Sequence, residues 1–315
     1  FVAGGEGNDT IYGGAGDDVL DGGSGNDRMF GEDGNDMITG GIDADTINGG
    51  DGDDTIISGG GNDNVNGGSG DDTIDSGDGN DYVNPSLGTN IVSTGAGDDH
   101  VYAGTTWSIN TIETGAGNDL VEYLGNYSTN VVDLGAGDDV ASFGYLRGRE
   151  EIGVTTLTLG SGADTIVFPH TINGVLSEYT MVTVTDFNTV EDKLSLGPLL
   201  ESSTMTGWDG TTNPFSTEPG GGYFLLVQSG DDTLLKFDSD GGGNNLQTLV
   251  TLQNTQASDF TGANFDPAYP PFEVPEVAGA LTSAAFEGND AFELDLLAGA
   301  SDVDNGNSAT LQIAN

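Results

Sequence analysis

Hydrophobic residues recur every nine positions along the first third of the chain, and most of them follow a glycine-rich, polar segment. They are Ile11, Leu20, Met29, Ile38, Ile47, Ile56, Val65, Ile74, Val83, Val92 and Val101. In the blocks that begin at Gly4, Gly13 and Gly22, glycine fills the first, second and fourth positions and permits a tight turn, after which a short strand turns one apolar side chain inward. Two blocks therefore predict one turn of a flattened coil, and successive turns are expected to stack as parallel strands about 4.8 Å apart.

The charge of the chain works against this coil. Five Lys and Arg residues face 52 Asp and Glu residues, for a net charge of −47, and there is no Cys. Stacking places the sixth-position carboxylates about 5 Å apart, where they repel one another. A divalent cation converts this repulsion into binding. Without thiolates the ligands must be oxygen atoms, and carboxylates combined with carbonyls suit Ca²⁺ better than Mg²⁺.

The same composition excludes several classes of protein. A nucleic-acid-binding protein needs a basic face, and so does a protein drawn to anionic membranes. No apolar run approaches the roughly 18 to 20 residues of a membrane helix. The only histidines, His100 and His170, lie far apart, so no His-Glu-x-x-His zinc motif exists, and no Gly-x-Ser-x-Gly elbow is present. We expect no catalytic residues, no nucleic-acid partner and no membrane insertion.

The block Gly-Gly-Ala-Gly-Asp-Asp-Val-Leu-Asp at 13–21, with its in-phase copies, closely resembles the calcium-binding nonapeptide of RTX (repeats-in-toxin) proteins. The resemblance extends from residue 4 to residue 167. It implies an all-β fold, a parallel β-roll over 1–167, whose calcium ions are part of the structure. It also implies export of the unfolded chain through a bacterial type I channel, with folding driven by external calcium.

Alternate blocks lie on opposite edges of such a roll, which sorts the candidate metal ligands into two sets. The first edge carries Asp9, Asp27, Asp45, Asp63, Asp81, Asp99, Asp119, Asp139 and Asp164. The second edge carries Asp18, Asp36, Asp54 and Asp72, followed by Asn90, Asn110 and Asn130. One ion between each successive pair of aspartates gives about eight sites on the first edge and about three on the second, on the order of ten ions in all.

The second edge changes where its aspartates end. There each full turn of two blocks becomes longer by two positions, as in Thr94–Glu113 and Thr114–Asp133. We expect calcium on both edges in the first half of the roll and on one edge afterwards, where Asn side chains and longer loops replace the metal. An alternative is that the Asn edge binds metal through carbonyls and waters. The irregular blocks at 31–39 and 40–48 leave the total open.

The nine-residue phase ends near Phe168, and residues 168–266 show β-rich alternation. The segments 179–187, 222–228, 233–237 and 246–252 predict antiparallel strands and hairpins that cap the roll. A cap is expected because the end of a solenoid exposes an unpaired strand edge. Asp238 and Asp240 are a candidate ion site or an ordinary polar turn.

The last part of the chain differs again in composition. Four prolines within 267–275 predict an extended linker over 267–278. Residues 279–315 resemble the first strands of cadherin-like or Ig-like β-sandwich modules, in which Asp302 and Asp304 match an acidic turn that binds calcium or forms an Asx turn. Both ends of the chain look internal to a longer protein.

Two functions fit this sequence. The first is a calcium-binding structural module of a large secreted or cell-surface protein, such as an adhesin or a matrix or surface-layer component, whose partners include copies of that protein or the extracellular matrix. The second is the C-terminal calcium-binding and secretion region of an enzyme whose catalytic domain lies upstream. The cadherin-like segment favours the first.

Overall fold

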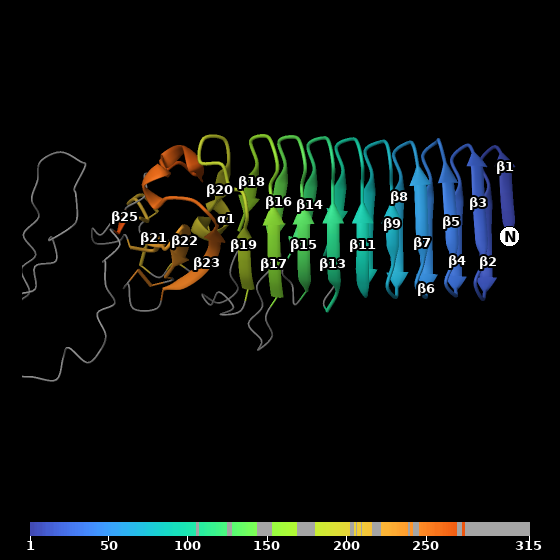
Figure 1. Ribbon diagram of the computed structural model, residues 1–315, viewed down its shortest axis with the longest axis horizontal. Coiled ribbons are helices and arrows are strands. Elements are labelled where there is room, and N and C mark those ends of the chain that lie inside the picture. Colours follow the sequence, from blue (N-terminus) through green and yellow to red (C-terminus); the bar gives the residue numbers. More distant parts are fainter. Residues whose placement is uncertain are drawn as a thin grey trace, which may run out of the picture.

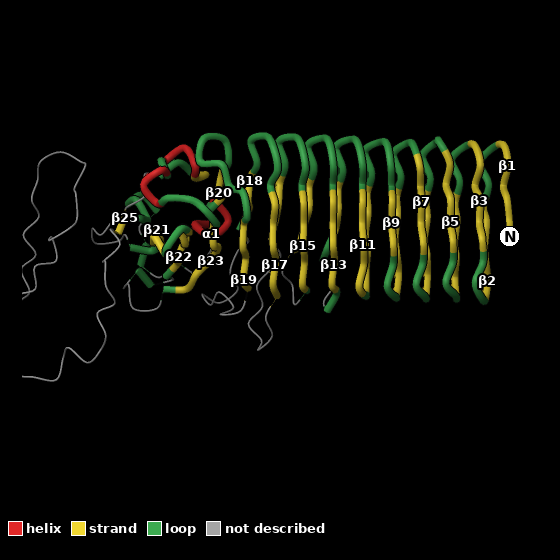
Figure 2. Tube along the Cα trace, viewed as in Figure 1, coloured by secondary structure: helices red, strands yellow, loops and turns green. Residues whose placement is uncertain are grey.

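The computed structural model describes residues 1–104, 107–124, 128–143, 153–168, 180–201, 205, 207–208, 210–215, 222–238, 240–241, 246–269 and 273–274. Within them the chain forms an elongated, flattened coil that ends in a compact cap (Figure 1). Two parallel sheets face each other along the coil, and the chain crosses from one sheet to the other every half turn (Figure 2).

The odd-numbered strands form one face of the coil. They are β1 (Val2–Glu6), β3 (Val19–Ser24), β5 (Met37–Gly41), β7 (Thr55–Gly59), β9 (Thr73–Asp75), β11 (Thr89–Ser93), β13 (Ile109–Glu113), β15 (Thr129–Asp133), β17 (Gly153–Thr158) and β19 (Thr180–Val184). The even-numbered strands form the other face. They are β2 (Thr10–Ala15), β4 (Arg28–Asp33), β6 (Thr46–Asp51), β8 (Asn64–Ser69), β10 (Tyr82–Leu87), β12 (His100–Tyr102), β14 (Leu120–Leu124), β16 (Val140–Phe143), β18 (Thr165–Val167) and β20 (Lys193–Ser195).

The pairing register confirms the predicted parallel β-roll and its change of period. In the early turns a residue pairs with the one eighteen positions later, as Ile56 does with Ile74. In the longer turns the partner lies twenty positions later, as for Val92 and Ile112, and towards the cap the separation grows again, since Leu157 pairs with Val184. The apolar residues predicted from the nine-residue period are all buried, from Ile11 at 4% exposed to Val101 at 0%.

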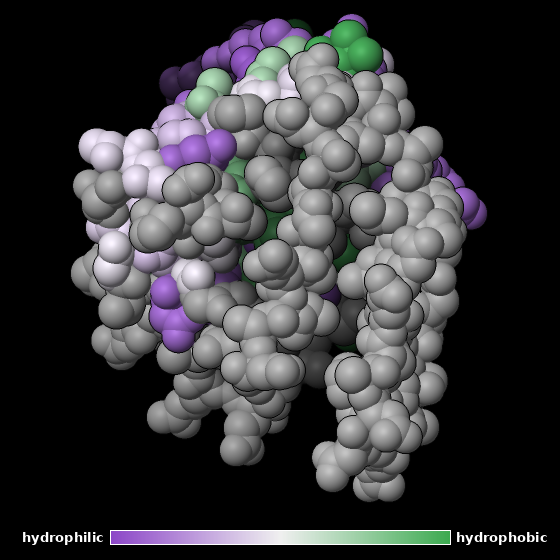
Figure 3. All heavy atoms as spheres, turned by 90° about the vertical axis from the view of Figure 1, so that its left-hand side faces the viewer, coloured by the Kyte–Doolittle hydropathy of each residue, from purple (hydrophilic) through white to green (hydrophobic). Residues whose placement is uncertain are grey.

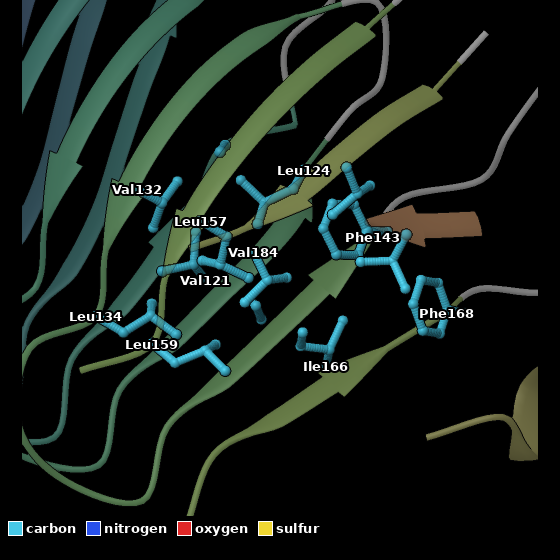
Figure 4. Packing of buried hydrophobic residues seen from close by; sticks show 14 of the residues in the cluster. Val121, Leu124, Val132, Leu134, Phe143, Leu157, Leu159, Ile166, Phe168 and Val184 are labelled. Carbon is cyan, nitrogen blue, oxygen red and sulfur yellow. The ribbon is translucent and has the colours of Figure 1, made fainter. Parts of the chain in front are cut away.

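The core between the sheets widens towards the cap. In the first turns each half turn buries one large apolar side chain, whereas from Leu124 onwards many half turns bury a second one. Figure 4 shows this wider core, in which Leu134, Leu159, Phe143 and Phe168 lie beside the residues that continue the original row. The rings of Phe143 and Phe168 stack with centroids 6.0 Å apart. Apolar burial therefore increases where the second edge has lost its aspartates.

The cap continues the sheets of the roll. It contains α1 (Gly197–Glu201), β21 (Phe224–Ser229), β22 (Asp232–Phe237), β23 (Gln247–Leu252), the 3-10 helices η1 (Ala257–Asp259) and η2 (Gly262–Asn264), β24 (Phe265–Asp266) and β25 (Glu273–Val274). Strands β21, β22 and β23 pair antiparallel, which confirms those hairpins. Strand β19 pairs parallel with β17, so the antiparallel prediction for 179–187 was wrong: this segment adds another turn to the stack.

The cap also has an aromatic core of its own. Phe215, Phe224, Phe237 and Phe265 are buried, and neighbouring ring centroids lie 4.7 to 5.5 Å apart. Seen from this end, the described surface is mainly hydrophilic to neutral, with hydrophobic side chains gathered in a small area near its upper rim (Figure 3). The division at residue 167 stays a prediction, because roll and cap share both sheets. Residues 279–315 and most of 267–278 lie outside the described residues.

Candidate metal-binding edges of the roll

The aspartates predicted for the first edge form one continuous ladder. The backbone N–H of Asp27 donates to Oδ1 of Asp45 at 2.8 Å, that of Asp45 to Asp63, and that of Asp63 to Asp81. The same bond recurs at every turn from Asp9 to Asp164, at 2.7 to 2.9 Å. From Asp27 onwards these residues are 1 to 2% exposed. All nine predicted members therefore lie in register on one edge.

The second edge begins with the same ladder of backbone N–H to carboxylate bonds and ends with a ladder of side-chain amide bonds. Asp18, Asp36 and Asp54 each donate to the carboxylate one turn ahead, and Asp72 donates to Oδ1 of Asn90. From Asn90 onwards the side chains bond to one another, with Nδ2 of Asn90 donating to Asn110 at 3.1 Å and Nδ2 of Asn110 donating to Asn130 at 2.9 Å. A neutral amide ladder thus takes the place of a row of carboxylates.

In most carboxylates of the two ladders, Oδ1 accepts a hydrogen bond from a backbone N–H and Oδ2 has no hydrogen-bond partner. Twelve of the thirteen predicted aspartates have a buried Oδ2 atom with no hydrogen-bond partner; they are Asp9, Asp27, Asp36, Asp45, Asp54, Asp63, Asp72, Asp81, Asp99, Asp119, Asp139 and Asp164. Leaving one buried carboxylate oxygen unpaired costs free energy, and here it recurs turn after turn. This regularity indicates that a missing positive partner belongs beside Oδ2.

The first glycine of a block packs directly against that oxygen. A Cβ atom placed on Gly22 would lie 2.5 Å from Oδ2 of Asp27 and 2.6 Å from the carbonyl oxygen of Gly40 in the next turn. On the second edge, Gly13, Gly31, Gly49 and Gly67 occupy the same position beside Asp18, Asp36, Asp54 and Asp72. A carboxylate oxygen and a carbonyl oxygen thus come together beside the glycine Cα in these blocks, and a side chain there would displace them.

This oxygen-only donor set fits a hard divalent cation. No three acidic or histidine side chains gather around one point in the described part of the chain, so each ion would draw on few carboxylates and otherwise on backbone carbonyls. Calcium accepts such mixed oxygen ligands and irregular geometry. The residues present therefore suit calcium better than a metal that demands nitrogen or sulfur.

Burial raises the pKa of the ladder carboxyl groups from Asp36 to Asp192. Desolvation is the main cause, neighbouring carboxylates add to it, and the backbone N–H bond to Oδ1 opposes it. The pKa rises to about 7 for Asp72 and Asp139 and to about 6 for Asp45, Asp54, Asp99 and Asp164. Without a metal, keeping these buried carboxylates ionised therefore lowers the stability of the folded roll.

The raised pKa values predict that acid stabilises the fold in chelator and weakens calcium binding when calcium is present. Because the folded pKa values lie above the ordinary value of 3.8, the metal-free fold binds more protons than the unfolded chain and loses stability as pH rises through 6 to 7. In chelator, lowering the pH from about 7.5 to about 5.5 should therefore increase the β signal in circular dichroism. In calcium the same step should weaken binding, because protons compete for the ligands. A β signal in chelator that falls on acidification would contradict this assignment.

The structure adds residues that the sequence analysis missed. Asp192 continues the first edge, since its Oδ1 accepts from the N–H of Asp164 at 3.1 Å. Its Oδ2 accepts from the N–H of Asn188 at 2.7 Å, so both of its oxygens are bonded and the ladder ends there. The available signal was the apolar Leu194 two residues later, the spacing that follows every sixth-position aspartate.

A second ladder runs along the outside of both edges. Oδ1 of the fifth-position Asn or Asp accepts from the N–H of the fifth-position residue one turn later, as from Asn80 to Asn62 and from Asp98 to Asn80. The sequence signal was the recurrence of Asn or Asp at this position. The irregular blocks keep the fold: Glu32 and Ser86 adopt the positive φ of the second glycine, at 74° and 66°, and Asp43 accepts from the N–H of Gly25.

The remaining candidates lie apart from the edges. His100 is on the outer face of β12, with Nε2 3.1 Å from Oε2 of Glu122. The cluster Arg147, Arg149, Glu150 and Glu151, together with His170, Asp302 and Asp304, lies outside the described residues.

Comparisons with known proteins match a family model to the first third of the chain. A family model described as the RTX calcium-binding nonapeptide repeat matches residues 1–29, 22–56, 30–65, 48–83, 57–92 and 85–106. No curated protein matches the chain. Among solved structures, the solution structure of the AlgE6R3 subunit from the Azotobacter vinelandii mannuronan C5-epimerase is similar, with 20% identity over 68% of this chain and 92% of that one. Its TM-score is 0.22.

Proposed function

Residues 1–106 of this chain are RTX calcium-binding nonapeptide repeats, and from that premise we propose that the chain is a structural module of a large secreted, cell-surface protein that folds when it meets extracellular calcium. Adhesins and matrix or surface-layer components are the class of protein that this module suits. The observation that carries the proposal is the row of buried, unpartnered Oδ2 atoms along both edges.

The thirteen predicted aspartates are the proposed calcium ligands. In the blocks that begin with glycine, Oδ2 lies near a carbonyl of the next turn, so an ion bound by both oxygens would tie neighbouring turns together. On the second edge the ligands end at Asp72, and the amide ladder of Asn90, Asn110 and Asn130 needs no metal because its members bond to one another. We therefore assign calcium to both edges of the first turns and to one edge of the later turns.

Secretion follows from the calcium requirement. RTX repeats occur in extracellular proteins exported by type I secretion, and we place this chain on the same route. At sub-micromolar cytosolic calcium the charged repeats stay open, whereas millimolar external calcium saturates sites of extracellular affinity and stabilises the fold by mass action. None of the helices in the described ranges is long and apolar enough to cross a membrane.

Circular dichroism of the full chain tests this proposal. In chelator near neutral pH we expect residues 1–167 to lack β signal, and calcium should produce a large β signal in a saturable titration. Magnesium at the same concentration is the matched control and should produce much less, because it prefers strict octahedral geometry. An unchanged, fully folded spectrum in chelator would rule out calcium-driven folding.

A further inference from the structure

Outside the roll, one described carboxylate shares with the proposed calcium ligands a buried oxygen that has no hydrogen-bond partner. Asp238 follows β22 in the cap, is 1% exposed, and has a buried Oδ2 with no hydrogen-bond partner. Among the described residues, thirteen aspartates have such an oxygen; twelve stand on the ladders of the roll and the thirteenth is Asp238. The signature that marks the roll ligands thus recurs in the cap, well beyond the last repeat.

The contacts of Asp238 fix its position and leave Oδ2 unsatisfied. Its N–H donates to the carbonyl of Tyr223 at 2.8 Å, which anchors it beside the hairpin of β21 and β22. Its Oδ1 accepts from the N–H of Asp240 at 3.2 Å, as in an Asx turn. The Asx turn accounts for the hydrogen bond to Oδ1 only. The ordinary polar turn, which is the alternative named in the sequence analysis, does not explain why Oδ2 is buried without a partner.

No cation of the protein neutralises this carboxylate in the described structure. The chain has five Lys and Arg residues, and the one ion pair among the described residues joins His100 to Glu122 on the roll. Solvent does not reach the carboxylate either, since Asp238 is 1% exposed and its neighbours Tyr223 and Phe237 are 2% exposed. A buried carboxylate that lacks both a cation and a full set of hydrogen bonds is costly.

From this geometry we infer that the cap binds a divalent cation of the calcium class at Asp238, with Asp240 beside it. Oxygen ligands select a hard cation, and an ion at Oδ2 removes the unpaired charge. The site is separate from the ladders of the roll, so the cap takes one ion more than the ladders provide. Calcium then stabilises the cap as well as the roll.

Ion counting on the full chain with calcium alone tests the inference. Native mass spectrometry and calorimetry would compare Asp238→Asn with Asp259→Asn, which removes the same charge from the exposed face of η1. Asp238→Asn keeps an Oδ1 acceptor for the N–H of Asp240, so the turn is retained. We expect it to bind one ion fewer than the wild type, and Asp259→Asn to bind the full number. Equal counts in the two variants would overturn the inference.

Two further measurements separate the possible failures. Asp63→Asn on the roll should also lower the count, so a loss there without one at Asp238 overturns the cap site and leaves the proposed function standing. If neither the wild type nor any of the variants binds calcium, the proposed function fails as well. Should Asp238→Asn not fold, a crystal structure of the wild type in calcium decides. A metal peak about 2.3 to 2.6 Å from Oδ2 supports the site, and a water or a side-chain donor there overturns it.

Discussion

Replacing Asp63 by alanine is expected to uncouple the first turns of the roll from the rest. Asp63 lies near the middle of the first edge; its Oδ1 accepts from Asp45, and its own N–H donates to Asp81. Its Oδ2 is buried and unpartnered. Removing one partner of a buried charge contact costs about 3 to 5 kcal/mol, and here the ions on both sides lose a ligand. The calcium midpoint of folding, followed by circular dichroism, should rise steeply.

Asn130→Ala is the matched change on the other edge. Asn130 is equally buried, but it accepts from Nδ2 of Asn110 and donates to Oγ of Ser128, both neutral groups. Its loss should cost about 1 kcal/mol per hydrogen bond and leave the calcium midpoint nearly unchanged. Asp63→Asn separates the two roles of Asp63, because it keeps the Oδ1 acceptor and removes the charge. Equal shifts in Asp63→Ala and Asn130→Ala would defeat the assignment of calcium to the first edge alone in the later turns.

Gly49→Ala is expected to block a site on the second edge without touching a ligand. Gly49 is the first residue of its block, and an added Cβ would meet both Oδ2 of Asp54 and the carbonyl oxygen of Gly67 closer than real Cβ atoms approach. Its φ is not positive, so alanine is not excluded by the backbone. Overpacking costs about 1 to 3 kcal/mol, and the loss of an ion adds to it. We expect one bound calcium fewer and a lower melting temperature in calcium.

Gly60→Ala provides the control for this prediction. Its added Cβ would have no neighbour closer than 3.7 Å, and its φ is not positive either. Alanine there should be neutral or slightly stabilising, because it restricts the unfolded chain. On the first edge, Ser58 and Thr94 already stand where earlier blocks have glycine, and their hydroxyls donate to the next turn. If Gly49→Ala retains its full calcium count, the second edge tolerates a side chain there too, and the proposed site is misplaced.

The roll could be predicted because its rules are local and repeated. A nine-residue period fixes which residue faces inward and which edge each aspartate joins as far as Asp99, and the recurring Gly-x-Gly-x-Asp motif extends the first edge to Asp164. The switch at Asn90 was also visible, since a change of ligand and a change of period coincide. Each of these inferences needs only the sequence spacing and the pleat of a strand.

The parts that escaped prediction depend on contacts between distant segments. Polar and apolar residues alternate along strand β19 as they do in many antiparallel strands. Only the parallel pairing of β19 with β17 shows that it forms a further turn of the roll. Asp192 joins the first edge at a distance from Asp164 in the sequence that no period announces. The unpaired Oδ2 of Asp238 is a property of the folded cap, because a two-residue acidic turn has the same sequence whether buried or exposed.

The two halves of the roll also differ in how freely their length can change. Up to Val92, successive turns have the same length and the same register, so each turn meets the same surface above and below. Adding or removing one such turn would alter the length by about 4.8 Å and leave every interface as it was. The later turns are longer, and from β15 onwards they also differ in length from one another, so their pairing registers are not interchangeable. The number of turns in the first half can therefore change without altering the pairing of the others, whereas the second half has a fixed set of turns that joins the first half to the cap.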